Sequence, residues 1–280
     1  MPNMGTSVKL ARRSPMRGRP VRCAAVEWKE DEVPIMKQLW AVVGVCAVGA
    51  VGLMAQGGVQ APALPTVDQV LDRNVTAMGG RAALEKVTSI TARGSISVPE
   101  AGLTGNFELY QKAPDKALTV VDFGGQGQRE GFDGVVGWAV DLQSGLREKS
   151  GVELVEAKRG AVFSRELRMK SLYRTLTVTG RERIGTRDAI VVEAVPAEGT
   201  PTRLFYDAES GLLVRQLVTR QSADGPMEVE ITFEDFRAVD GVMRPFTIRQ
   251  AVSTFTAVVQ LSEIRQNVPV DDAMFKKPGI

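Results

Sequence analysis

The sequence predicts a mainly β protein with some α-helix, built on a single antiparallel sheet. Residues 227–234 alternate strictly between apolar side chains and polar or charged ones. Such alternation is typical of a strand with one packed face and one face in water. Similar short segments recur along the chain, separated by turn sequences such as Asp133-Gly134 and Asp240-Gly241. No Pro- or Ser-rich linker interrupts residues 66–275, so we expect one domain over residues 64–280.

The clearest hairpin covers residues 203–215. Two apolar runs, 204–206 and 212–214, flank a turn that begins at Asp207 and ends at Gly211. An Asp side chain can cap such a turn, and Gly can adopt the positive φ that returns the chain. Applying the same criteria, apolar runs separated by turn residues, from residue 89 onward predicts about 10–12 antiparallel strands.

Helices are predicted at two places. Thr66 and Gln69 form a capping-box pattern, apolar residues recur at helical spacing from Val67, and Gly79-Gly80 ends this first helix. A short helix follows over residues 81–86, and residues 150–172 carry apolar spacing for one or two more, with a break at Gly160.

These helices are too few to cover the predicted sheet. A helix about 10 Å wide shields only two or three strands at a spacing of about 4.8 Å. The uncovered apolar face must therefore close on itself, dimerise or enclose a ligand, while ordinary core packing remains the alternative reading.

A signal peptide is predicted over residues 36–63. Lys37 precedes an apolar stretch, residues 39–54, that is shorter than most membrane spans. Small residues suited to cleavage follow between Ala55 and Ala63. We therefore expect an exported, periplasmic protein, and a retained membrane anchor is the alternative.

Residues 1–35 are basic and lie upstream of this complete signal. We expect either that translation starts at Met36 or that the segment is a disordered extension. Residues 1–61 hold eight Lys and Arg against four Asp and Glu, which leaves 27 against 29 in the rest. The basic excess therefore belongs to the N-terminal segment, and nothing in the remainder indicates a nucleic-acid partner.

Catalytic and metal-binding patterns are absent from the sequence. The chain has no His, and its two cysteines, Cys23 and Cys46, both precede the predicted cleavage. Ser–His, Cys–His and His-ligated metal sites are thereby excluded. The pair Asp271-Asp272 would point to opposite sides of an extended segment, so we expect a cap or a solvated turn there. We predict neither an enzyme nor a cofactor.

Several segments resemble the LolA/LolB-like outer-membrane lipoprotein-sorting proteins of the bacterial periplasm. They are Met78–Leu84, Tyr110–Lys116, Gly131–Trp138, Tyr206–Leu213, Phe233–Val242 and Asn267–Phe275. The resemblance covers about residues 67–275 and rests on turns and strand starts. It implies a half-closed β-barrel whose N-terminal helices and helical insertion cover a concave face, with an apolar cavity for acyl chains.

The resemblance also implies a function and partners. A protein of this group is a periplasmic carrier for acyl chains of lipoproteins or lipids, without catalysis, that passes its cargo to another envelope protein. Cys46 follows Val45 instead of a small residue, which favours a soluble carrier resembling LolA over an anchored receptor resembling LolB. We expect a monomer. The alternative is an envelope structural or stress-sensing module with a protein partner.

Alternation indicates which residues would meet the acyl chain. Burying the glutamates of residues 227–234 would be unfavourable by several kcal/mol each, so their apolar neighbours should face inward. Trp138 is expected at the cavity wall because of its place after the Asp133-Gly134 turn, and the helical insertion should close the mouth. The expected lipid-binding residues are Phe107, Leu109, Trp138, Val155, Phe163, Val229, Ile231 and Phe233.

Overall fold

The structure is a computed structural model that describes residues 63–141, 145–222 and 225–279. The predicted basic extension and the signal peptide up to residue 62 lie outside the described residues. Within the described residues, 13 strands form one antiparallel sheet with few helices. The predicted fold class is confirmed.

The element bounds are as follows. The strands are β1 (Ser89–Val98), β2 (Leu103–Lys112), β3 (Lys116–Asp122), β4 (Gly127–Phe132), β5 (Gly137–Asp141), β6 (Gly145–Glu148), β7 (Thr175–Ile184), β8 (Arg187–Val195), β9 (Thr202–Asp207), β10 (Leu213–Ser222), β11 (Gly225–Val239), β12 (Val242–Ala251) and β13 (Thr256–Gln266). The α-helices are α1 (Val67–Ala77), α2 (Arg81–Glu85), α3 (Gly151–Ala161) and α4 (Met169–Leu172), and the 3₁₀ turns are η1 (Pro99–Ala101), η2 (Arg165–Leu167) and η3 (Asp272–Phe275).

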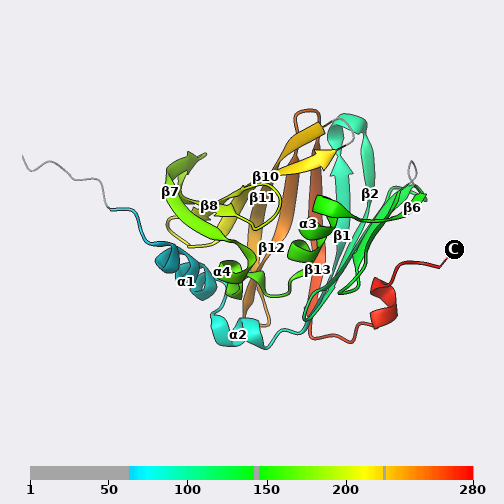
Figure 1. The fold of residues 1–280 in the computed structure, drawn as a ribbon, viewed down its shortest axis with the longest axis horizontal. Coiled ribbons are helices and arrows are strands. Elements are labelled where there is room, and N and C mark those ends of the chain that lie inside the picture. Colours follow the sequence, from blue (N-terminus) through cyan, green and yellow to red (C-terminus); the bar gives the residue numbers. More distant parts are fainter. Residues whose placement is uncertain (1–62, 142–144, 223–224, 280) are drawn as a thin grey trace, which may run out of the picture. The chain divides into compact units, whose positions relative to one another are not determined.

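Two meanders make up the sheet. Its strand order is β6-β5-β4-β3-β2-β1-β13-β12-β11-β10-β9-β8-β7, so the first and last strands pair at its centre. The strands β6 and β7 are its two edges, and the segment from α3 to α4 connects them in the chain (Figure 1). Because the edge strands do not pair with each other, the sheet is open, as a half-barrel is.

The sequence does not predict β6. Its four residues, Gly145–Glu148, include a single apolar side chain, Leu146. A strand this short gives no alternation to recognise. It pairs with β5. With β6 included, the sheet has 13 strands, one more than the upper limit of the predicted range of about 10–12.

Helix α1 is fixed to the hairpin of β9 and β10. Its capping box is formed, since Thr66 Oγ1 accepts from Gln69 N at 3.2 Å and Gln69 Oε1 accepts from Thr66 N at 2.8 Å. Arg73 Nη2 donates to the Glu209 carbonyl at 2.6 Å, and the buried Asn74 side chain donates to the Gly211 carbonyl at 3.0 Å. Helix α1 is therefore held against the sheet by hydrogen bonds to the β9–β10 turn, which is more than 100 residues away in the sequence.

That turn has the predicted chemistry. Asp207 Oδ1 accepts from the backbone N–H groups of Glu209 and Ser210 at 3.1 and 2.6 Å, and Gly211 has φ +79°. Burial alone would raise the pKa of Asp207, but the hydrogen bonds from Ser210 and Glu209 outweigh burial and hold that pKa below its usual value. The hairpin is thus a rigid support for α1.

The helices pack on one face of the sheet, which we call the helix face. One core cluster joins α1 and α4 to β8 and β9, and another joins α2 and Phe163 to β1 and β12. A third cluster lies on the central strands β1, β2, β12 and β13. Figure 1 shows α3 and α4 over the strands, with α1 and α2 toward the lower left of the sheet. The prediction that few helices cover an apolar face of the sheet is confirmed, but the opposite face also carries buried apolar residues, among them Ala189, Val191 and Phe205.

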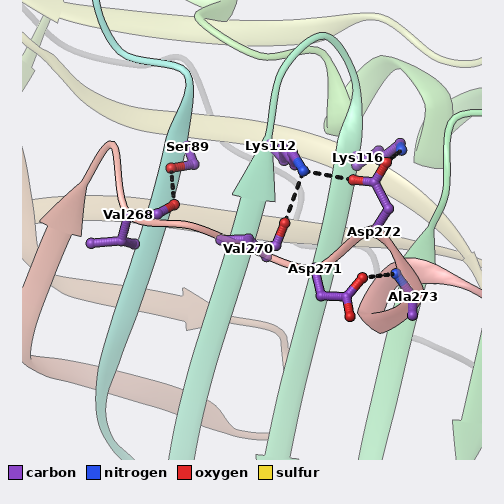
Figure 2. Close-up of polar contacts among 8 residues, drawn as sticks. All are labelled: Ser89, Lys112, Lys116, Val268, Val270, Asp271, Asp272 and Ala273. Carbon is purple, nitrogen blue, oxygen red and sulfur yellow. Dashed lines mark hydrogen bonds and ion pairs between the residues drawn. The ribbon is translucent and has the colours of Figure 1, made fainter.

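The opposite face, here called the outer face, is covered over β2–β5 by the C-terminal tail, residues 267–279. Tyr110, Leu118 and Trp138 form a core cluster there with Val270 and Phe275 of the tail. Polar contacts fix the tail in place (Figure 2). The tail therefore completes a second, smaller core.

Figure 2 shows how the two neighbouring aspartates of the tail diverge. Asp271 caps η3 by accepting from Ala273 N at 2.9 Å. Asp272 turns to the sheet and forms ion pairs with Lys112 at 2.8 Å and Lys116 at 2.7 Å, which lower its pKa to about 2. The expectation that the two side chains diverge and that this segment forms a cap is confirmed.

Candidate functional site

The helix face holds a cavity of about 240 Å³ between the helices and strands β9–β12. Aromatic and aliphatic side chains make up about half of its wall, and polar or charged side chains make up much of the rest. The lining residues include Met78, Ile90, Met169, Leu204, Tyr206, Leu213, Gln216 and Phe233. Small-molecule sites are usually lined predominantly by apolar side chains and measure roughly 300–1,000 Å³, so this cavity is smaller and more polar than most.

Two further cavities adjoin the first. They measure about 160 and 440 Å³, and Gly160 of α3 lines all three. Arg165 and Gln216 line the first and second, and Gln111 lines the first and third. We call the three together the trough; it runs beneath the segment from α3 to α4.

Helix α3 covers the trough with little buried contact. Ala161 is its one buried residue within the described structure. Exposed polar contacts hold the helix: Arg147 donates to Glu153 at 2.7 and 2.9 Å, and Arg159 Nη1 donates to the Glu198 carbonyl at 3.1 Å. The Arg147 hydrogen bonds lower the pKa of Glu153, against the effect of burial. Since exposed ion pairs contribute only about 0–1 kcal/mol each, α3 is a weakly held cover.

Charged and phenolic groups also reach the first cavity. Arg165 and Glu166 of η2 and Arg244 of β12 line it, together with the buried Tyr206. Burial lowers the pKa of Arg244, with a smaller opposing effect from Glu166. Burial, and then the neighbouring Tyr173 and Glu166, raise the pKa of Tyr206, so its phenol is neutral at pH 7.

The predicted orientation of β11 is confirmed. Val229 and Ile231 are buried, Ile231 lines the second cavity and Phe233 lines the first. The alternating glutamates lie on the outer face, where Glu230 pairs with Arg215 at 3.2 Å and Glu234 pairs with Arg249 at 3.2 Å. The alternation therefore identifies the helix face correctly.

The two residues expected on β2 also lie on the helix face. Leu109 pairs with Ala92 in the register and lines the third cavity, while Phe107 belongs to the central cluster. Their neighbour Glu108 has the opposite orientation and accepts a hydrogen bond from the Tyr110 hydroxyl. Whether any of these residues binds a lipid stays a prediction.

Trp138 lies elsewhere, and its expected place in the cavity wall is wrong. It is 2% exposed, and its Nε1 donates to the Phe275 carbonyl at 2.8 Å beneath the C-terminal tail. The register sets Trp138 opposite Gly131, where an added Cβ would collide with the indole ring. The physical reason lies in the register: Gly131 pairs with both Trp138 and Leu118, so Trp138 shares the outer face with Leu118, whereas its distance from the turn fixes only its place along the strand.

The two residues expected at the mouth differ from each other. Phe163 is 4% exposed and packs in the core with Leu84, Ile90 and Val242, so it is a core residue and not a mobile closure. Val155 is half-buried on α3. Of the two, only Val155 is on the weakly held cover.

Sequence reasoning missed the residues where the trough is polar. Arg165, Arg244 and Gln216 lie among apolar residues of the helix face, and no motif marks them. Tyr206 is within the hairpin that the sequence identifies, and its alternation with Phe205 could have placed it on the same face as Leu204. The predicted break at Gly160 lies one residue before the end of α3 at Ala161, and the separate segments η2 and α4 follow.

Comparison with solved structures gives the fold class. A domain described as outer-membrane lipoprotein-sorting, from Vibrio parahaemolyticus, is 15% identical with a TM-score of 0.54, over 75% of this chain and 97% of that one. A LolA superfamily protein from Nitrosomonas europaea is 15% identical with a TM-score of 0.52, over 76% and 98%. A DUF1329 family protein from Desulfovibrio piger is 16% identical with a TM-score of 0.52, over 75% and 97%. The chain has the LolA-like fold that the sequence resemblance implies.

The other comparisons add no family. No family model matches this sequence, and no curated protein matches it. Among the described residues, no helix is long and apolar enough to cross a membrane. The described residues also contain no group of His, Cys, Asp and Glu that could hold a metal ion.

Proposed function

We propose that this protein binds acyl chains of lipoproteins or lipids in the trough and carries them within the cell envelope, without doing chemistry. The observation that carries the proposal is the set of three cavities that meet at Gly160 beneath α3. They lie on the helix face, beneath a helix with one buried residue. Apolar side chains line much of the first cavity, whereas polar and charged side chains predominate in the other two. The shared fold supports a carrier role.

The volume of the cavities determines how an acyl chain could be accommodated. The first cavity, at about 240 Å³, is smaller than most ligand sites, so a long acyl chain needs the adjoining cavities and an outward shift of α3. Each buried CH₂ contributes about 0.8 kcal/mol, so a C16 chain gains roughly 12 kcal/mol before ordering costs. That gain exceeds what the exposed ion pairs of α3 supply.

Slow release follows from that affinity, so a handoff protein in the envelope is part of the proposal. The predicted signal peptide supports a periplasmic location for the carrier, and we expect it to act as a monomer.

The second candidate is an envelope structural or stress-sensing module with a protein partner. The close packing of α1, α2 and α4 on the sheet favours it, because those helices already bury much of the helix face. In that case α3 would have no cargo to cover, and the trough would stay empty or hydrated.

Substitution at Gly160 separates the two candidates. A Cβ at this position meets no atom within 4 Å, so a side chain can be added without displacing the backbone. Gly160→Phe should reduce binding of a fluorescent fatty acid by about tenfold or more, because this one residue lines all three cavities and a large side chain is added there. Gly160→Ala is the matched control, and it should bind as the wild type does, with helix stability raised by roughly 1 kcal/mol.

Fluorescence titration measures the affinity, and thermal denaturation confirms that both variants fold. Equal affinity in the wild type and in Gly160→Phe would contradict binding in the trough. A wild-type protein that binds no fatty acid would favour the structural or sensing module.

A further inference from the structure

Two arginines give the first cavity a positive charge that an acyl chain does not require. Arg165 is on the η2 turn, and Arg244 is on the facing strand β12. Both line the cavity, and Glu166 is the one acidic residue that lines it with them. The charged part of the wall is therefore positive overall.

Neither guanidinium group is fully hydrogen-bonded. The Nε atoms of Arg165 and Arg244 are buried and have no hydrogen-bond partner. Arg165 Nη2 donates to the Tyr173 hydroxyl at 3.5 Å, and Arg244 Nη2 donates to Gln266 Oε1 at 3.3 Å. Both distances exceed the usual range for N–H···O hydrogen bonds.

No ion pair neutralises either arginine among the residues that the structure describes. Glu166 acts on Arg244 through its charge but lies beyond ion-pair distance. Arg215 has a third buried Nε without a hydrogen bond, but it lies 3.2 Å from Glu230 Oε2 on the outer face. Arg165 and Arg244 differ from Arg215 in that they face a cavity.

A buried guanidinium without an acidic partner is unfavourable, because it loses water and gains no opposite charge. Its planar, forked donors match the oxygens of a carboxylate or phosphate. The uncharged part of the wall is mixed: Leu204, Leu213 and Phe233 line it, and so do the polar side chains of Asn74, Gln111, Ser164 and Gln216. The two arginines and the apolar residues of the same cavity would together suit a ligand with both an acidic group and an apolar part.

We propose that Arg165 and Arg244 bind the acidic head group of an anionic amphiphile, a carboxylate or a phosphate, whose apolar chain lies in the trough. This inference rests on the proposed function and narrows its cargo. A neutral acyl ester would leave both guanidinium groups unpaired, so the protein should select acidic amphiphiles over neutral ones of the same chain length.

The test compares 11-(dansylamino)undecanoic acid with its methyl ester by fluorescence titration of the full protein. The wild type should bind the acid at least about tenfold more tightly, since hydrogen bonds between charged groups are stronger than neutral ones. Arg244→Gln and Arg165→Gln should each weaken binding of the acid by roughly tenfold and leave binding of the ester unchanged. Displacement by laurate and by dodecyl phosphate then shows which acidic head is preferred.

Arg249→Gln is the matched control, because Arg249 is on the same strand as Arg244 but pairs with Glu234 on the outer face. It should keep the preference of the wild type. Equal affinity for acid and ester in the wild type would overturn this inference while leaving acyl binding in place. A preference that survives in both cavity variants would overturn it as well. Failure to bind either probe would remove the proposed function and this inference together.

Discussion

Substitution of Trp138 by Phe tests whether this side chain anchors the C-terminal tail. The indole Nε1 donates to the Phe275 carbonyl at 2.8 Å, and the ring is 2% exposed. Phe keeps the six-membered ring but removes the donor, which leaves a buried carbonyl without a partner. Such a loss costs about 1–3 kcal/mol, and the missing part of the ring leaves a small void that adds roughly 1 kcal/mol.

A total of about 2–4 kcal/mol should lower the midpoint of thermal unfolding by roughly 5–10 °C for a domain of this size. Circular dichroism measures that midpoint, and limited proteolysis should show earlier cleavage within the tail. Val135→Ala is the control, since Val135 is 75% exposed in the same β4–β5 connection and its truncation should leave the midpoint unchanged. Binding of a fluorescent fatty acid should be unaffected by Trp138→Phe. An unchanged midpoint together with weakened binding would refute the assignment of Trp138 to the outer face.

The remaining predictions concern the helix face, the tail and helix α1. Ile231→Glu should abolish fatty-acid binding and destabilise the protein, because a charge enters the trough, whereas Glu230→Ile should preserve binding and lower solubility; equal effects would mean that the faces are misassigned. The pKa of Asp272 is lowered to about 2, so the stability from its ion pairs is present above about pH 4 and is lost as the pH falls toward 2. Acid titration of unfolding should lose this dependence in Asp272→Asn, and an unchanged profile would contradict it. Asn74→Ala removes the buried hydrogen bond to the Gly211 carbonyl and should lower the free energy of unfolding by about 1–3 kcal/mol in urea titration; a change under 0.5 kcal/mol would argue against this docking of α1.

Local chemistry explains why much of the fold could be predicted. The cap at Thr66 and the turn from Asp207 to Gly211 depend on side chains within three or four residues of each other. The alternation of residues 227–234 reports one strand and its two faces. Such features are visible in a sequence because the interacting groups are neighbours in it.

Contacts between residues far apart in the sequence explain why the prediction for Trp138 was wrong and why the cavity arginines were missed. Trp138 meets Phe275, which is 137 residues away, and no local pattern reports that the tail covers the outer face. The turn at Asp133-Gly134 locates Trp138 along its strand but carries no information on which face of the sheet the side chain occupies. Arg165 and Arg244 are far apart in the sequence, and only the folded structure brings η2 and β12 together so that both arginines line one cavity. The candidate site could therefore be predicted as a face of the sheet but not as a set of residues.

The central claim is that the trough beneath α3 holds an acyl chain. Native mass spectrometry of the full protein, purified under mild conditions from its own cells, tests this claim most directly. We predict a second species, heavier by the mass of an amphiphile with an acyl chain, that is lost in Gly160→Phe and kept in Gly160→Ala. A spectrum with the mass of the protein alone in the wild type, or an adduct that persists in Gly160→Phe, would contradict it.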